Sequence, residues 1–174
     1  MSFSYKRFRS GNQQEIVFLN LRKNPGLICK SGNEAFVLTD LKTHDKTFQY
    51  SVQQFLDSCQ TNKIHLIGIK QNFANAVFTK QKSLIQFNSK LIFLADPDFE
   101  HQQFPQKIKT DVVLVTGNPK ISLNQITQNL TFDFLVIDAT NSDYHIKKLA
   151  DEAAADGRKI FILKRNYCLR INSN

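Results

Sequence analysis

Short apolar runs, separated by turn residues, dominate the first part of the chain. Glu15–Leu21 is followed by the turn Asn24-Pro25-Gly26, and Leu27–Lys30 is followed by the turn Ser31-Gly32-Asn33. Runs of this length, bounded by Gly, Pro and Asn, are typical of β-strands joined by tight turns. With Ala35–Thr39 as a third run, the pattern predicts an antiparallel meander at the start of the fold.

A short helix is predicted to follow this meander. Ser51 and Gln54 have the spacing of a capping box, and apolar residues recur at helical spacing from Val52 to Cys59. We therefore expect a helix over Val52–Cys59, with Phe48–Tyr50 as a short strand before it. Four more strands are expected at Ile64–Ile69, Ala76–Phe78, Ser83–Phe87 and Lys90–Leu94, and the polar stretch from Asp96 to Lys109 is expected to be a loop.

Strands and helices alternate in the second half. Val112–Val115 and Phe134–Ile137 are continuous apolar runs, which is typical of strands buried on both faces. Ile160–Leu163 and Cys168–Ile171 are expected to close the chain as a hairpin. Helix caps are predicted at Ser122 for one helix and at Ser142 or Asn141 for a second, which Gly157 is placed to end.

These patterns together indicate an α/β fold in which helices pack on β layers. The first half is β-rich, and the second half reads strand–helix–strand–helix–strand. A chain of 174 residues without a visible linker is expected to form a single domain, over residues 15–174. Residues 1–14 are polar and basic and are expected to be a lead-in to that domain.

The charge balance is basic. Lys and Arg number 23 against 15 Asp and Glu, which gives a formal net charge of +8. Such a balance favours anionic partners, either nucleic acid or an anionic lipid surface, but a basic protein without such a partner is an equally good interpretation. No apolar run approaches the roughly 18 residues of a membrane span. We expect a soluble chain, which is compatible with a piece excised from a membrane protein.

Recognisable catalytic and cofactor motifs are absent from the sequence. The six glycines form no phosphate-cradling loop or dinucleotide fingerprint, and no serine sits in a nucleophile elbow. Metal sites usually leave local pairs of ligands in a sequence, whereas the histidines here are scattered singly and are expected to be structural. These histidines are His44, His65, His101 and His145.

One acidic cluster, Asp96-Pro97-Asp98-Phe99-Glu100, directly follows a predicted strand. Loops at strand ends are common places for metal-binding or catalytic acids. Asp and Pro are also turn-forming residues, and a solvated turn is the interpretation that the residues alone favour.

Two stretches resemble a known family. DVVLVTGNPKISLNQI, FDFLVIDATNSDYHIKKLADEA and GRKIFILKRNYCLRI, all within Asp111–Ile171, resemble the C-terminal end of ComEC-type competence proteins. SLIQFNSKLIFLADPDFE resembles the hairpin that precedes the acidic loop of the same domain. The resemblance implies a metallo-β-lactamase-like αββα sandwich over nearly the whole chain.

The resemblance also implies that the metal centre of the wider superfamily has been lost. The H-x-H-x-D-H motif that supplies most ligands in metal-binding members is absent. Where the ComEC domain often has paired histidines, this chain has Asn118 and Pro119, which are poor or impossible ligands for zinc. Only an acidic position remains, at Asp96 or Asp98, and one carboxylate does not hold a catalytic zinc. We therefore expect a degenerate domain without metal, cofactor or hydrolase activity.

ComEC proteins form the channel that carries single-stranded DNA across the bacterial inner membrane. The resemblance implies that this domain lies beside the channel portion of the same full-length protein, on the outer face of that membrane. A first hypothesis is that the domain contacts single-stranded DNA through its basic C-terminal segment. Its contact residues would be Arg158, Lys159, Lys164, Arg165, Tyr167 and Arg170.

Three alternatives remain open from the sequence. The basic segment is at least as well explained as a hairpin with solvated lysines. A second functional hypothesis is a protein–protein interaction module of the channel that does not contact DNA. A third is a residual metal-dependent phosphoesterase that uses Asp96, Asp98 and His101.

Overall fold

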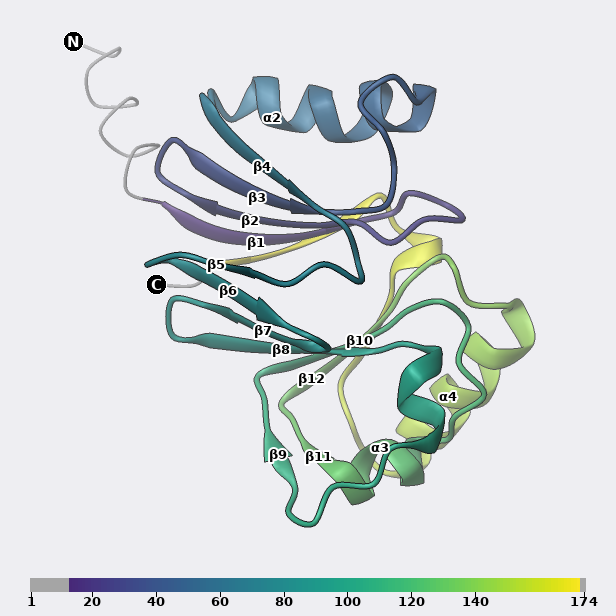
Figure 1. Cartoon of the computed structure of the whole chain (residues 1–174). Helices are drawn as coiled ribbons and strands as arrows, with labels where there is room; N and C mark the ends of the chain where they lie inside the picture. Colours follow the sequence, from purple (N-terminus) through teal and green to yellow (C-terminus); the bar gives the residue numbers. More distant parts are fainter. Residues whose placement is uncertain (1–12, 173–174) are drawn as a thin grey trace, which may run out of the picture.

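Two β-sheets lie face to face, and helices cover the outer face of each, in the computed structural model of residues 13–172 (Figure 1). The first sheet has the order β14-β1-β2-β3-β4, and the second has the order β13-β12-β10-β8-β7-β6-β5. The first sheet comprises β1 (Gln14–Leu19), β2 (Leu27–Ser31), β3 (Glu34–Leu38), β4 (Lys63–Ile67) and β14 (Cys168–Asn172). The second comprises β5 (Phe73–Ala74), β6 (Phe78–Gln81), β7 (Leu84–Phe87), β8 (Lys90–Ala95), β10 (Val112–Val115), β12 (Phe134–Ile137) and β13 (Ile160–Ile162).

The helices form the two outer layers. A π-helical segment continues into α2 and packs on the first sheet, whereas α3 and α4 pack on the second (Figure 1). The helical segments are η1 (Phe48–Gln53), α2 (Gln54–Ser58), η2 (Pro97–His101), α3 (Leu123–Asn129), α4 (Asp143–Ala155) and η3 (Leu163–Arg165). A small parallel pair, β9 (Ile108–Lys109) with β11 (Leu130–Thr131), lies beside α3. This layer order confirms the predicted αββα sandwich.

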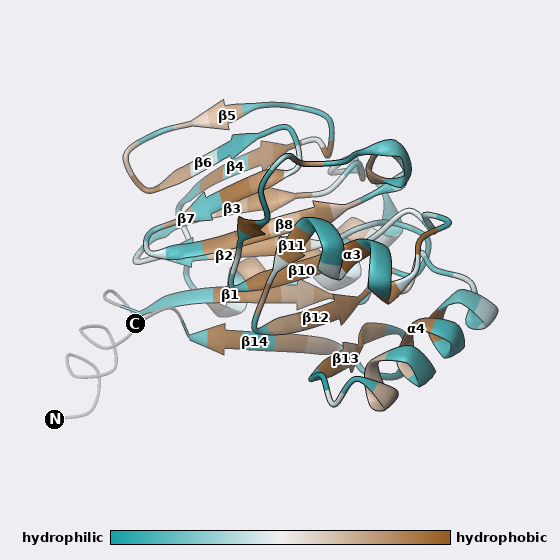
Figure 2. Ribbon diagram, turned by 90° about the horizontal axis from the view of Figure 1, so that it is seen from below, coloured by the Kyte–Doolittle hydropathy of each residue, from teal (hydrophilic) through white to brown (hydrophobic). Residues whose placement is uncertain are grey.

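The continuous apolar runs follow from this layering. Successive side chains of a strand point to opposite faces, so a strand between two layers needs apolar residues at every position. In β10, Val112 and Leu114 pack between the sheets, while Val113 and Val115 pack under the helices. β10 and β12 are accordingly coloured as hydrophobic in Figure 2. β10, β12 and β13 lie side by side in one sheet, all parallel.

The predicted helix caps are present in the second half. The Ser122 side chain accepts a hydrogen bond from the backbone N–H of Gln125, at the start of α3. Of the two candidates for α4, Ser142 is the cap, accepting from the N–H of His145. Gly157, with a φ of 65°, follows the last turn of α4 in the left-handed conformation that glycine favours.

Several predicted elements were wrong. Phe48–Tyr50 is the start of a helical segment, because Phe48, Val52 and Phe55 lie at helical spacing and are all buried against the first sheet. Ser51 therefore lies inside that segment and caps nothing. The strand expected at Ala76–Phe78 begins only at Phe78. The stretch to Lys109 holds η2 and β9 as well as loop.

The prediction that the last two strands form a closing hairpin was also wrong. β13 joins the second sheet beside β12, whereas β14 joins the first sheet beside β1.

Most of the expected basic lead-in lies outside the described residues, and β1 begins at Gln14. Within residues 13–172, no helix has the length and apolar character of a membrane-spanning segment.

Candidate functional site

The carboxyl ends of β8, β10 and β12 meet at one edge of the second sheet, because the three strands are parallel and adjacent. Ligand sites in sheets of parallel strands gather at such an edge. Asp96, Thr116 and Asp138 are the first residues beyond these strands, and all three are buried. We call this region the strand-end edge.

Asp96 is held by a lysine from the loop that connects the two sheets. The Nζ atom of Lys70, in the loop after β4, donates to Asp96 Oδ2 at 2.9 Å and also to Asp98 Oδ2. The hydrogen bond to Asp98 and, to a smaller extent, the hydrogen bond to Asp96 raise the pKa of Lys70. Asp96 is only 7% exposed, whereas Lys70 and Asp98 are exposed. Lys70 thus forms ion pairs with both aspartates of the predicted acidic loop.

A second lysine lies beside this group. Lys80, on β6, is 1% exposed, and its Nζ donates to the backbone carbonyl of Lys82 at 2.7 Å. Burial lowers the pKa of Lys80, and the charge of Asp96 acts against that effect. Lys70, Lys80 and Asp96 line one cavity of about 300 Å³. No described residue donates a hydrogen bond to the buried Oδ1 of Asp96.

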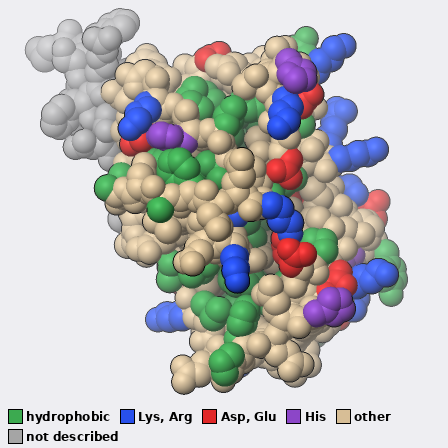
Figure 3. Space-filling model, viewed as in Figure 1, with side chains coloured by type: hydrophobic (Ala, Val, Ile, Leu, Met, Phe, Trp, Pro, Cys, Tyr) green, Lys and Arg blue, Asp and Glu red, His purple; other side chains and the backbone are tan. Residues whose placement is uncertain are grey.

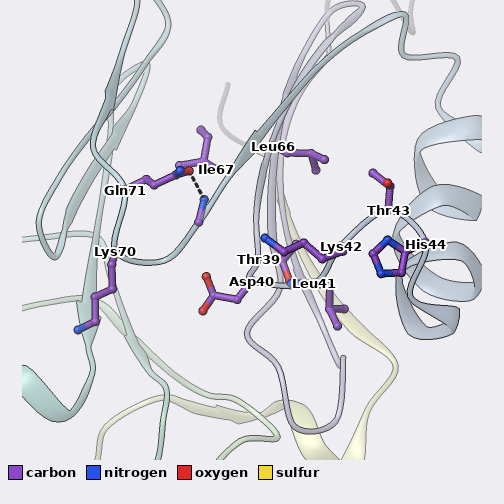
Figure 4. A pocket seen from close by; sticks show the side chains of 11 residues that line it. Thr39, Asp40, Leu41, Lys42, Thr43, His44, Leu66, Ile67, Lys70 and Gln71 are labelled. Atoms are coloured by element: carbon purple, nitrogen blue, oxygen red, sulfur yellow. Dashed lines mark hydrogen bonds between the residues drawn. The ribbon is translucent and has the colours of Figure 1, made fainter.

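The loop that carries Lys70 is fixed on both sides. The N–H of Gly68 donates to Gln71 Oε1 at 2.8 Å, which is the bond drawn in Figure 4, and the N–H of Ile69 donates to Asp40 Oδ1 at 2.9 Å. This loop and the segment after β3 line a neighbouring cavity of about 560 Å³. In Figure 4, the side chain of Lys70 points away from that segment.

Asn118 and Pro119 have structural roles in the loop after β10. Gly117 has a φ of 77°, and an added Cβ would lie 2.9 Å from Pro97 Cδ. Asn118, with a φ of 57°, accepts a hydrogen bond from the N–H of Ser142 on its Oδ1 atom. Pro119 is buried. This loop therefore packs against the acidic loop and orients the start of α4.

The residues at the strand-end edge do not fit a divalent metal ion. Among residues 13–172, no three His, Cys, Asp or Glu side chains are grouped as metal ligands. Asp96 and Asp98 both already pair with Lys70, and His101 lies exposed at the end of η2. The set proposed for a phosphoesterase, Asp96, Asp98 and His101, does not form a metal site.

Asp138 is the centre of a buried polar cluster. It accepts hydrogen bonds from the hydroxyl of Thr116, from the hydroxyl and N–H of Thr140, and from the side-chain amide of Asn141. His145 in turn contacts Asn141 Oδ1 and the carbonyl of Ile121 through its two ring nitrogens. Burial raises the pKa of Asp138 to about 6, although these donors oppose the shift. This cluster was missed from the sequence, because Asp138, Thr140 and Asn141 share one loop but meet Thr116 from the loop after β10, 22 positions before Asp138.

The six residues predicted to contact nucleic acid lie in three separate places. Arg158 stacks on the Phe132 ring at 5.1 Å and pairs with Asp156, at the amino end of β13, with Lys159 exposed beside it. Arg170 lies over the Phe55 ring at 5.0 Å and pairs with Glu15, next to α2. Lys164, Arg165 and Tyr167 lie around η3, at the other end of β13.

The η3 segment is fastened to the loop after β1. The Asn20 side-chain amide donates to the carbonyls of Leu163 and Asn166, and its N–H donates to the carbonyl of Tyr167. That loop adds two exposed cations that the sequence analysis missed, and the two segments lie side by side in Figure 1. We call the resulting patch the basic surface, and it consists of Arg22, Lys23, Lys164, Arg165 and Tyr167.

The charges of the basic surface are only partly balanced. Lys164 pairs with Asp143 at 2.9 Å, whereas Arg22, Lys23 and Arg165 have no ion-pair partner among the described residues. Tyr167 is 67% exposed. Lys and Arg side chains crowd the right-hand side of the molecule in Figure 3, where these loops lie in Figure 1.

Comparisons with known proteins agree with the predicted family. The profile of the ComEC C-terminal domain matches residues 16–173. A solved metallo-β-lactamase fold protein, YhfI from Bacillus subtilis, is similar over 91% of this chain and 100% of its own, with 10% identity and a TM-score of 0.49. No curated protein matches. Because the profile spans nearly the whole chain, the protein belongs to the ComEC C-terminal domain family.

Proposed function

We propose that this domain is a non-catalytic accessory part of a ComEC-type DNA-uptake channel and that it contacts single-stranded DNA through the basic surface. The observation that carries the proposal is the convergence of four cations and one exposed tyrosine in two loops of a domain from this family. In this proposal the domain lies beside the channel portion of the full-length protein, on the outer face of the bacterial inner membrane.

The chemistry of the basic surface supports contact with a single strand. Guanidinium and ammonium groups bind phosphate oxygens, and an exposed aromatic ring offers a platform on which a base stacks. Arg22, Lys23 and Arg165 keep their charges available, because none of them pairs with a described carboxylate. Arg158 and Arg170 stack on phenylalanine rings and pair with acids elsewhere, so they support this contact less well.

The strand-end edge supports a role other than hydrolysis. Lys70 engages the two acids, and Asn118 holds the start of α4. Nothing in this arrangement offers the three-ligand set of a catalytic zinc. We expect labelled single-stranded DNA to remain intact when it is incubated with the domain.

The test is fluorescence anisotropy of labelled single strands over a salt series. Binding should be weak and indifferent to sequence, and log K should fall with log salt by roughly 0.7 per phosphate contacted. Replacing Lys164 and Arg165 by Gln should reduce that slope by roughly one to two. Tyr167→Ala should weaken binding by about 1–3 kcal/mol without changing the slope, since stacking releases no ions.

The matched control is Lys159→Gln. Lys159 is an exposed lysine of the same segment but lies at the opposite end of β13. Its replacement should leave the slope unchanged. A loss equal to that of the Lys164 and Arg165 variant would point to general charge attraction instead of the basic surface.

The alternative is an interaction module without DNA contact, and one observation favours it. β4 is an edge strand of the first sheet, and Ile64 and Leu66 on it are 40% and 44% exposed. Exposed apolar side chains on a sheet edge favour contact with another polypeptide. If the wild-type domain binds no single strand even at low salt, this alternative replaces the DNA proposal.

A further inference from the structure

The buried carboxylate of Asp96 requires a compensating positive charge. Asp96 is 7% exposed, and an ionised carboxylate out of water is costly unless a counter-charge accompanies it. In metal-binding members of this fold a divalent ion lies among such acids. Here the surrounding residues offer no metal-ligand set within residues 13–172.

Two ammonium groups supply positive charge at this place. Lys70 Nζ lies 2.9 Å from Asp96 Oδ2 and bridges to Asp98, and Lys80 lines the same cavity of about 300 Å³ while being 1% exposed. Together the two side chains bring the formal charge of one divalent ion. Lys70 lies in the loop that runs from β4, at the edge of the first sheet, to β5, at the edge of the second, and it contacts Asp96 directly after β8.

The placement of Lys70 is fixed by the backbone around it. The N–H groups of Gly68 and Ile69 are both held by side chains, and the N–H of Gln71 donates to the carbonyl of Gly68 at 3.0 Å. Lys70 therefore lies in a closed turn whose neighbours do not move freely. A fixed turn presents the ammonium to the acids at a reduced entropic cost.

We propose that Lys70, with Lys80 behind it, takes the place of the divalent metal ion as the counter-cation of Asp96 and Asp98. This tethered cation fastens the loop between the two sheets to the strand-end edge and excludes divalent ions from that edge. The proposal does not depend on DNA contact.

The first test is Mn²⁺ binding, followed by electron paramagnetic resonance of free Mn²⁺ with the full chain. The wild-type protein should show no saturable site. Lys70→Ala combined with Lys80→Met should create one site, because both competing charges are gone while the acids remain. Adding Asp96→Asn should abolish that site. Saturable binding by the wild type as tight as by the double variant would overturn the proposal.

The second test is a double-mutant cycle on stability, measured by urea unfolding. Lys70→Ala should lower the folding equilibrium constant by about fivefold, because it leaves Asp96 buried without its partner, although solvent screens the exposed Lys70 side chain. Asp96→Asn in that background should restore most of the loss. Lys42→Ala is the matched control, since Lys42 lines the neighbouring cavity but has no ion-pair partner among the described residues. Its effect should stay within about twofold.

Both tests have outcomes that decide the question. Equal stability of wild type and Lys70→Ala, or additive effects of the two substitutions, would make the ion pair incidental and overturn the proposal. If Lys70→Ala with Lys80→Met is too unstable to titrate, its melting temperature should rise with added Mn²⁺ while that of the wild type stays constant. If the melting temperature of the variant does not change when Mn²⁺ is added, that result would count against the proposal.

Discussion

Asp138 shows how one side chain sets a property of the strand-end edge. It is 2% exposed and is surrounded by hydroxyl and amide donors, yet burial still raises its pKa from 3.8 to about 6. The ionised form is therefore less favourable in the folded chain than in the unfolded chain. The stability that Asp138 contributes is fully present below its unfolded pKa and is lost as the pH rises through its folded pKa.

The raised pKa of Asp138 leads to a direct prediction of how stability depends on pH. Asp138 should lower the free energy of unfolding by about 3 kcal/mol as the pH rises from about 4 to beyond 6. Asp138→Asn should remove that slope, because an amide does not titrate and its oxygen still accepts from Thr140. Urea unfolding at several pH values measures the effect. Asp151→Asn, at an exposed acid on α4, is the control and should keep the slope.

Lys70 and Asp138 also mark the limit of prediction at the scale of residues. The sequence singled out Asp96 and Asp98 because an acidic run after a strand is visible locally. Lys70 is one lysine among many, and its partner Asp96 lies 26 positions away, directly after β8. A pairing between two single residues across a fold leaves no periodic trace in a sequence.

At the scale of elements, Asn118 couples the loop after β10 to the start of α4. Its side chain accepts from the N–H of Ser142, and its φ of 57° lies in the region that Asn tolerates better than Ala. The position at which the resemblance implied a lost metal ligand is thus an orienting contact for a helix.

Asn118→Ala should destabilise the fold by about 1–3 kcal/mol, through the lost hydrogen bond and the strained backbone. Asn118→Gly relieves the strain but not the lost bond, so it should recover part of the stability. Asn118→Asp keeps an acceptor and should be nearest to the wild type. The comparison is made by urea unfolding at neutral pH. A wild-type stability for Asn118→Ala would show that Ser142 alone fixes the start of the helix.

Elements with strong local signals were predicted well, and those decided by distant partners were not. β10 and β12 were visible as continuous apolar runs, and the caps of α3 and α4 as serines before helical patterns. The strand predicted at Phe48–Tyr50 was wrong because three residues are too few to distinguish the period of a strand from that of a helix. The closing hairpin was wrong because the pattern cannot show that β13 and β14 belong to different sheets.

The same long-range pairing explains why two of the five residues of the basic surface were missed. Arg22 and Lys23 adjoin Lys164 and Arg165 only because β14 lies beside β1 and Asn20 holds the η3 segment. The sequence identified one basic segment and grouped six residues by their proximity along the chain. In the fold, a strand separates Arg158 and Lys159 from the other four.

At the scale of the whole molecule, the C-terminal strand completes the first sheet. β14 pairs with β1 over five residues, and its Leu169 and Ile171 pack against the core between the sheets. Removing residues 168–174 should uncover the edge of β1 and that part of the core. We expect loss of the cooperative unfolding transition and association in size-exclusion chromatography. Arg170→Gln, which keeps the strand but not its ion pair, is the control and should remain monomeric and folded if the wild type is monomeric.

The pairing of the first strand with the last has a consequence for the order of folding during synthesis. Glu15 and Arg170, which meet across β1 and β14, are 155 residues apart along the chain. At about 5–20 residues per second, a ribosome needs roughly ten to thirty seconds to deliver the partner of β1. During that time the second sheet emerges strand by strand and is free to assemble from neighbouring segments. The first sheet must wait with an open edge, so the growing chain is most exposed to misassociation in the interval before β14 emerges.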